Sequence, residues 1–264
     1  MLCRSKERAE SARTEIAKLS SNQEIQILLA DLAELSQVEK VVQDLQAKEK
    51  KVDVLVCNAG VLLNDRQTTK EGNFELTFAS HLMGGSFLLS QLLMPQLKAS
   101  SDQGRVVFVS SGGMYNTPFP AWETATSSDL QKYDGQMAYA YAKRGQILLA
   151  EHCAKEYPEI SWTTCHPGWT QTPAVDAAYG DQKRYLEPMR NTWQGCEGIA
   201  WMVGCDKTKL ENGAFYLDRQ TQRKHLSGPF FTEGIYTKNT PGQVEDMIQR
   251  LRRTTGLDPD LDDE

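Results

Sequence analysis

The stretch Val-Asp-Val-Leu-Val-Cys-Asn-Ala-Gly, residues 52–60, decides the fold class of this chain. Its apolar residues run almost without interruption to Cys57, which is typical of a strand buried on both faces, as in a parallel sheet. Asn58, Ala59 and Gly60 form a turn, and helical periodicity follows over about 71–98. A buried strand followed by a turn and a long helix is the repeating unit of α/β folds.

Outward from this stretch, strands and helices alternate along the chain. The expected strands cover residues 25–30, 52–57, 105–111, 161–165 and 213–218, and the expected helices cover 5–19, 34–50, 71–98, 136–156 and 192–204. This alternation predicts a doubly wound parallel sheet with helices on both faces. We expect a single domain over residues 1–264 that ends in an acidic tail at about 255–264.

Composition excludes several function classes. With 264 residues, 40% hydrophobic and 24% charged, the chain can bury a substantial core. Its net charge of -6 argues against a nucleic-acid partner, which requires a basic surface. No apolar run approaches the roughly 18 residues of a membrane span, and no secretory signal is visible. We therefore expect an intracellular, cytoplasmic protein.

The six cysteines are scattered through the chain without CxxC pairing. Cys57 and Cys165 lie in apolar stretches, so reduced thiols are expected rather than disulfides. Cys165 and His166 are adjacent, but no second pair of ligands stands at metal-binding spacing. The sequence therefore predicts no metal site.

Turns and polar residues follow four of the expected strands, where ligand sites of parallel sheets lie. Asp31 follows the first strand, the turn at 58–60 the second, Ser111 the third and the turn at 166–168 the fourth. Each feature alone is also typical of a helix cap or an ordinary turn. Their occurrence at successive strand ends makes them candidate site residues.

A tyrosine and a lysine four residues apart occupy the helix expected at 136–156. Tyr139 and Lys143 share one helix face, which brings the phenol and the ammonium close together. A pair of this kind arises easily by chance and is often a solvated helix pair. Here it follows a buried strand that ends in Ser111, which favours a catalytic role.

Together these motifs resemble the short-chain dehydrogenase/reductase family. The matching residues run in family order along most of the chain: Asp31, Leu32, Asn58, Ala59, Gly60, Ser111, Tyr139, Lys143, Pro167, Gly168 and Thr172. The resemblance implies a Rossmann-like fold that binds a nicotinamide dinucleotide and interconverts an alcohol and a carbonyl compound. It assigns Ser111, Tyr139 and Lys143 as catalytic residues, with the remaining matches, Tyr139 and Lys143 facing the cofactor.

The mechanism implied by the resemblance depends on proton transfer. A tyrosine with the ordinary pKa of about 10 is a poor acid or base near neutrality unless a nearby cation stabilises its phenolate. Lys143 is expected to be that cation. Ser111 is expected to orient the substrate oxygen.

The family resemblance also implies a first strand and a glycine-rich turn ahead of the residues seen here. No glycine precedes Gly60 in this chain. We therefore expect an N-terminally truncated domain that lacks the first strand and first helix, roughly 35 to 40 residues on the scale of a βαβ unit. A chain without the turn that holds the cofactor pyrophosphate would bind NADPH weakly.

One position departs from the family pattern. His81 stands where many relatives have an asparagine that supports the lysine through a water molecule. A buried histidine satisfied by local hydrogen bonds is the simpler interpretation, and a relay in the catalytic site is the alternative. We keep His81 among the candidate catalytic residues.

The turn after the segment Met1–Cys3 bears on the type of cofactor. Arg4 begins this turn, and no acidic residue precedes Glu7, which favours NADP(H) over NAD(H). Aromatic residues, prolines and glycines around 112–136 and 169–193 predict mobile segments over an apolar carbonyl or alcohol substrate. Trp193 and Trp201 are expected in the core instead.

Two alternatives remain open from the sequence. The chain could be an inactive or non-enzymatic binding protein that cannot hold the dinucleotide. It could also use its long helices to associate with a second copy of itself, as a homo-oligomer.

Overall fold

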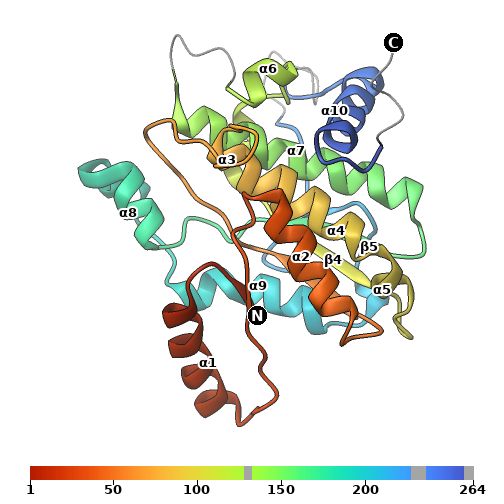
Figure 1. Cartoon of the computed structure of the whole chain (residues 1–264). Coiled ribbons are helices and arrows are strands. Elements are labelled where there is room, and N and C mark those ends of the chain that lie inside the picture. The colour runs from red at the N-terminus through yellow and green to blue at the C-terminus, as the bar shows by residue number, and fades with distance from the viewer. Residues whose placement is uncertain (128–132, 227–235, 259–264) are drawn as a thin grey trace.

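The computed structural model describes residues 1–127, 133–226 and 236–258, and its strands form a central layer between helices (Figure 1). The main sheet has the order β3-β4-β5-β6-β7. β3 to β6 run parallel and β7 is antiparallel to β6. The strands are β1 (Leu2–Cys3), β2 (Leu28–Leu29), β3 (Val54–Cys57), β4 (Arg105–Val109), β5 (Ser161–Cys165), β6 (Phe215–Leu217) and β7 (Gln220–Gln222).

The helices lie between the strands in the chain, as the alternating pattern predicts. In chain order they are α1 (Lys6–Ser20), α2 (Leu35–Gln46), α3 (Leu76–Phe78), the π-helix η1 (Ala79–Leu88), α4 (Leu89–Leu92), α5 (Met94–Lys98), the 3-10 helix η2 (Gly112–Asn116), α6 (Trp122–Ala125), α7 (Gly135–Glu156), α8 (Pro173–Tyr179), the 3-10 helix η3 (Gly180–Leu186), α9 (Thr192–Gly204), the 3-10 helix η4 (Lys207–Lys209) and α10 (Pro241–Thr254).

Strand β4 explains why the sheet needs a helical layer on each face. All five of its residues are buried, and successive side chains point to opposite faces. Val106 and Phe108 belong to the larger core cluster, which includes buried residues of α2, η1 and α7. Val107 and Val109 belong to a second cluster with Met202 of α9. Burial of each such side chain stabilises the fold by roughly 1.5 to 3 kcal/mol.

Helix α7 lies along the sheet with a defined start. Asp134 is its N-cap, and the carboxylate accepts hydrogen bonds from the backbone N–H groups of Gln136 and Met137 at 3.0 and 3.1 Å. Side-chain capping of this kind is worth about 1 kcal/mol. The cap fixes where the helix begins, and so fixes which of its residues stand at the carboxyl edge of the sheet.

The helix expected over 71–98 is interrupted. It begins at Leu76, and ten residues from Ala79 to Leu88 adopt π-helical geometry. Gly84 and Gly85 lie in this segment; a Cβ at Gly84 would lie 2.0 Å from the Leu32 carbonyl oxygen. The close approach of the backbone after β2 therefore requires glycine at this position. π-Helical turns are rare and frequently accompany functional sites.

The sequence-based boundaries fail at the C-terminal end of the fold. The strand expected at 213–218 is not the last one, because a tight turn leads into β7. Helix α10 was also not predicted, although its start carries a capping box between Thr240 and Gln243. The predicted acidic tail falls mainly on 259–264, outside the described residues.

Trp193 is 74% exposed, so its expected core position is wrong, whereas Trp201 packs against the second core cluster.

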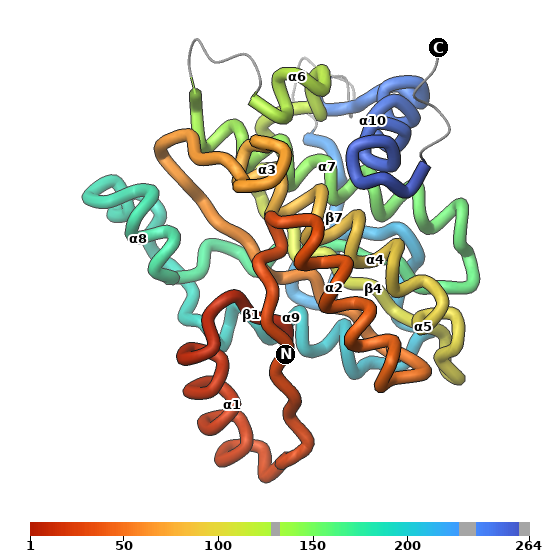
Figure 2. The backbone as a smooth tube through the Cα atoms, viewed as in Figure 1, coloured from red at the N-terminus to blue at the C-terminus, as the bar shows by residue number. Residues whose placement is uncertain are grey.

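Strands β1 and β2 form a separate two-stranded sheet. The Leu28 N–H donates to the Met1 carbonyl at 2.8 Å and the Ala30 N–H to the Cys3 carbonyl at 3.1 Å. Within the described residues no strand pairing joins β1 to β3. Leu2 and Leu28 still pack against the main core, while α1 lies at the periphery (Figure 2).

None of the helices in the described ranges is long and apolar enough to cross a lipid bilayer.

The division into two sheets predicts uneven protection from hydrogen exchange. Amides of the β1–β2 ladder should exchange much faster than those of β4 and β5. Opening a two-stranded sheet breaks few hydrogen bonds and exposes little apolar surface. Hydrogen exchange followed by mass spectrometry checks this. Equal protection of the two sheets would mean that the small sheet is held by interactions that the structure does not contain.

Candidate active site

The Lys143 side chain lies buried at the carboxyl edge of the main sheet. Its Nζ donates to the Val109 carbonyl, the last residue of β4, at 2.6 Å, and the residue is 3% exposed. Burial lowers the pKa of the ammonium from 10.5 to about 7. The nearest groups that oppose this shift are the thiols of Cys165 and Cys57, which end β5 and β3. Lys143 therefore stands where three parallel strands end.

Tyr139 lies one helical turn before Lys143 on the same face of α7. The Lys143 Nζ is 5.4 Å from the centre of the Tyr139 ring. Burial raises the pKa of the Tyr139 phenol, and a hydrogen bond with the Ser111 side chain opposes this. The net result is a raised pKa, so the lowering that the sequence predicted is not found. In this arrangement the phenol stays protonated at neutral pH.

Ser111 follows β4 and is brought to the same place by the turn into η2. Its hydroxyl accepts a hydrogen bond from the Gly113 N–H at 3.2 Å. A Cβ at Gly113 would lie 3.7 Å from both the Ser111 hydroxyl and the Tyr139 ring. The structure thus brings together Ser111, Tyr139 and Lys143, the three residues that the sequence predicted as catalytic.

His81 of the π-helix η1 packs edge-on against Tyr139, with ring centres 5.2 Å apart. Its Nε2 lies 3.0 Å from the Val61 nitrogen and 2.7 Å from the Val61 oxygen. Its buried Nδ1 has no hydrogen-bond partner among the described residues. Burial and the neighbouring Lys143 lower the pKa of His81 well below its ordinary value, so the ring is neutral.

Gly60 makes room for this histidine. A Cβ at Gly60 would lie 1.8 Å from the His81 ring. Asn58, Ala59 and Gly60 themselves are exposed at the carboxyl end of β3. The turn that the sequence assigned to the cofactor therefore borders the site on one side and supports His81 on the other.

The loop after β5 forms the opposite border. Pro167 and Gly168 are partly buried, and Gly168 has a φ of 75°, which favours glycine. Thr172 caps α8 through a hydrogen bond from the Val175 N–H at 3.4 Å. The cap orients α8, whose last residue, Tyr179, lies close enough to Tyr139 to affect its pKa.

Arg4 and Asp31 meet at the carboxyl ends of β1 and β2, with Arg4 Nη1 3.6 Å from the Asp31 carboxylate. A second Asp31 oxygen accepts the Ala33 N–H at 3.1 Å. The Leu32 carbonyl lies against the backbone of Gly84 in η1. These predicted cofactor residues therefore form one group, which belongs to the small sheet rather than to the main one.

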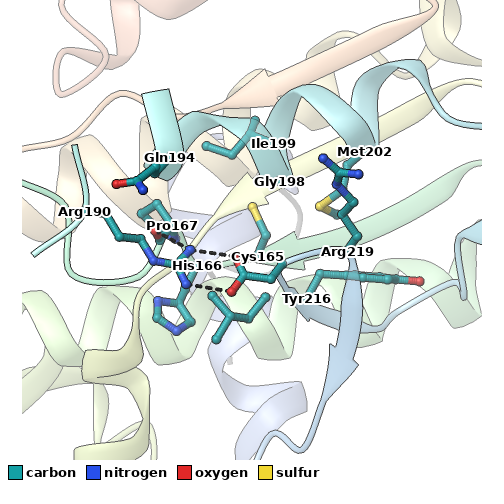
Figure 3. Close-up of a pocket in the computed structure, with 13 residues that line it drawn as sticks. Cys165, His166, Pro167, Arg190, Gln194, Gly198, Ile199, Met202, Tyr216 and Arg219 are labelled. Carbon is teal, nitrogen blue, oxygen red and sulfur yellow. Dashed lines mark hydrogen bonds and ion pairs between the residues drawn. The ribbon is translucent and has the colours of Figure 1, made fainter. Parts of the chain in front are cut away.

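Two of the hollows among the described residues differ greatly in size. One, beside His166 and Arg190, is almost filled and leaves a cavity of only about 10 Å³ (Figure 3). The other, about 600 Å³, lies between the C-terminal half of α7 and the start of α10, and no residue predicted for the site lines it. In the described ranges no group of three or more His, Cys, Asp or Glu side chains is placed to hold a metal ion. All six cysteines are free.

Ser111, Tyr139 and the buried Lys143 thus meet at the carboxyl edge of a parallel sheet, where ligand sites of α/β folds lie. Comparison with known proteins identifies the family. The family model of the short chain dehydrogenases matches residues 1–183. Human dehydrogenase/reductase SDR family member 12 is 34% identical over 96% of this chain and 77% of its own length. Human retinol dehydrogenase 13 is 30% identical over 93% of this chain and 71% of its own length.

The fold is also shared with solved structures. A short chain dehydrogenase from Escherichia coli CFT073 complexed with NADPH superposes with a TM-score of 0.62 at 20% identity, covering 81% of this chain and 83% of that one. The chain belongs to the short-chain dehydrogenase/reductase family, whose members are NAD(P)-dependent oxidoreductases.

The residues fit one half of a dinucleotide better than the other. At the nicotinamide end, the phenol, the ammonium and the unpartnered His81 Nδ1 converge between the exposed turn at 58–60 and the loop after β5. At the pyrophosphate end, no glycine-rich turn joins a strand to a helix within the described residues between β1 and β3.

Sequence reasoning missed three residues around the site. Tyr179 lies beside Tyr139, and Arg190 and Asp218 form an ion pair next to Pro167. Tyr179 falls within the aromatic-rich segment 169–193 that the sequence marked as flanking the site. Arg190 and Asp218 are 28 positions apart in the sequence, so no local sequence pattern predicts their ion pair.

The buried lysine predicts a pH-dependent stability. Between about pH 7 and pH 10.5 the unfolded chain binds a proton that folded Lys143 does not, so stability should rise with pH across this window. Lys143→Met removes the charge. Its gain in unfolding free energy over the wild type should be larger at about pH 6 than at about pH 10, by about 4 kcal/mol.

Chemical denaturation at the two pH values measures this difference. Lys155→Met, at an exposed position of the same helix, is the matched control and should show little change. A gain for Lys143→Met that is the same at both pH values would show that the ammonium is solvated.

Proposed function

We propose that this chain catalyses the NADP(H)-dependent interconversion of an apolar carbonyl compound and the corresponding alcohol. The observation that carries the proposal is the buried Lys143 ammonium beside Tyr139 and Ser111 at the carboxyl edge of the sheet. When bound, the nicotinamide supplies or accepts a hydride at the carbon of the substrate. The protein must supply the proton.

Tyr139 is the proposed proton donor. In reduction, its phenolic O–H bond breaks and a new O–H bond forms on the carbonyl oxygen, so that the phenolate remains. Burial raises the pKa of the phenol, so the proton is present before reduction begins. Lys143 then stabilises the phenolate, and is best able to do so below about pH 7, where its ammonium is charged.

Ser111 and His81 are assigned supporting roles. The Ser111 hydroxyl, held by the Gly113 N–H, is placed to hydrogen-bond the substrate oxygen beside the phenol. The neutral His81 ring fixes the position of the Tyr139 ring through its edge-on contact. Its unpartnered Nδ1 is a candidate acceptor for a water molecule that supports Lys143.

NADP(H) is favoured over NAD(H) because of the turn after β1. The Arg4 side chain is 63% exposed and its ion pair with Asp31 is long at 3.6 Å, so the guanidinium is accessible to a phosphate. The Escherichia coli relative in complex with NADPH supports this choice. Asp31, Leu32, Asn58, Ala59, Gly60, Pro167, Gly168 and Thr172 remain the proposed cofactor contacts.

An apolar substrate is favoured by the aromatic residues that cover the site. Trp169 packs edge-on against Tyr179, with ring centres 5.7 Å apart, and Tyr179 lies next to Tyr139. Asn64, in the loop after β3, donates to the Ala177 carbonyl of α8 at 3.4 Å and so draws α8 toward the site. A relative named retinol dehydrogenase acts, by that name, on an apolar alcohol.

A second candidate function is that of an inactive or non-enzymatic binding protein that holds the dinucleotide weakly. It is favoured because, within the described residues, strand pairing joins neither β1 nor β2 to the sheet that carries Lys143. That the protein is cytoplasmic, that it forms a homo-oligomer and that residues 1–264 form a single domain all remain predictions.

Turnover of a panel of aliphatic and aromatic aldehydes and ketones with NADPH, at concentrations well above micromolar, separates the two functions. Tyr139→Phe should lower kcat by about 10²- to 10⁴-fold, since it removes only the proton donor. Tyr141→Phe, two residues along the same helix, is the control and should retain activity. Turnover that survives in Tyr139→Phe contradicts the mechanism, and no turnover in the wild type favours the binding protein.

A further inference from the structure

The turn between β6 and β7 is held in an unfavourable backbone conformation. Asp218 and Arg219, its two central residues, have φ values of 51° and 66°. Two-residue hairpin turns of this kind normally carry Asn-Gly or Asp-Gly. Asp218 suits the first position, whereas Arg219 stands where glycine is usual and where positive φ is disfavoured for its side chain. Strain of this sort persists where surrounding interactions enforce it, and such places often serve a site.

Both turn residues form ion pairs, one with a residue just before α9 and one with a residue of α9 itself. Arg190 donates through its two terminal nitrogens to the two carboxylate oxygens of Asp218, each at 2.6 Å. Arg219 pairs with Glu197 of α9. The two-pronged geometry makes the first of these pairs the stronger and more directional one.

Arg190 also holds the loop after β5 through three hydrogen bonds. Its Nη1 donates to the Pro167 carbonyl at 3.4 Å and its backbone N–H to the Trp169 carbonyl at 2.7 Å. The Gln171 N–H donates to the Arg190 carbonyl at 2.9 Å. Arg190 is therefore the common partner of the strained turn and of the loop that carries the proposed cofactor contacts.

The Arg190 side chain is partly buried, at 30% exposure, whereas its partner Asp218 is 58% exposed. A Cβ at Gly168 would lie 2.6 Å from Arg190 Nε, so a larger residue there would displace the arginine. His166 stacks on Phe215 and accepts the Gly168 N–H at 3.0 Å. Figure 3 shows the guanidinium between Pro167 and the turn, and the remaining cavity of about 10 Å³ has no room for a ligand.

We propose that the Arg190–Asp218 ion pair is a positioning device, which locks the loop at residues 167–172 against the β6–β7 turn and so sets the affinity of the site for the nicotinamide half of NADPH. The proposal rests on the proposed function. Neither residue is assigned contact with the substrate. Asp218 acts through Arg190, and Arg190 acts through the loop.

Asp218→Asn is the sharpest test. Asparagine has nearly the same shape and tolerates positive φ, so the variant removes the charge without disturbing the turn. Glu197→Gln is the matched control, because it removes the charge of the other ion pair of the same turn. Two readouts are needed: hydrogen exchange of the Arg190 and Gln171 amides, and steady-state kinetics with NADPH.

In Asp218→Asn the two amides should exchange about fivefold faster and the KM for NADPH should rise by a similar factor. The kcat should change by less than about twofold, because Tyr139 and Lys143 are untouched. Exchange in β4 and β5 should not change. Glu197→Gln should leave both the amides and the KM near the wild type.

Exchange rates equal to those of Glu197→Gln would overturn the proposal. Faster exchange with an unchanged KM would also overturn it, because the ion pair would then be structural only. If the wild type shows no turnover, the proposed function fails, and NADPH titration of the same two variants replaces the KM as the second readout.

Discussion

The hydrogen bond between the Lys143 ammonium and the Val109 carbonyl is the interaction on which the site depends. It places a cation at the end of a fully buried strand, and no carboxylate lies within ion-pair distance of it in the described part of the chain. Burying such a group is costly, and the cost is reflected in the lowered pKa. A fold retains this arrangement where the charge has a use, and Tyr139 and Ser111 lie beside it.

The parallel sheet supplies the geometry that makes this site possible. Because β3, β4 and β5 run in the same direction, the loops after them open on one edge. That edge collects the 58–60 turn, Ser111 and the loop that begins at His166 from positions more than one hundred residues apart. Helix α7 then crosses the edge with Tyr139 and Lys143 one turn apart. The carboxyl edge thus gathers helix α7, Ser111 and two bordering loops from separate parts of the sequence.

Patterns that depend on nearby residues were predicted well. Apolar runs predicted the positions of β3, β4 and β5, although β3 is only partly buried and not fully buried as predicted. A four-residue Tyr-Lys spacing predicted that Tyr139 and Lys143 share one face of α7. Distant pairings did not. The Arg190–Asp218 contact depends on how the β6–β7 turn and the start of α9 pack, and the π-helical geometry at His81 depends on the approach of the Leu32 backbone to Gly84. The sequence predicts a strand over residues 25–30, whereas β2 has only two residues, because only Leu28 and Leu29 pair with β1.

The central claim is that Lys143 is a buried cation whose titration lies close to neutrality. Its pKa can be measured directly by following the Nζ resonance of ¹⁵N-labelled lysine through a pH titration, with the Lys143→Met variant used to assign the signal. The account predicts a midpoint at about 7, well separated from lysines at the ordinary value of 10.5. A Lys143 signal that titrates at the ordinary value would show that the ammonium is solvated, and would contradict the site described above.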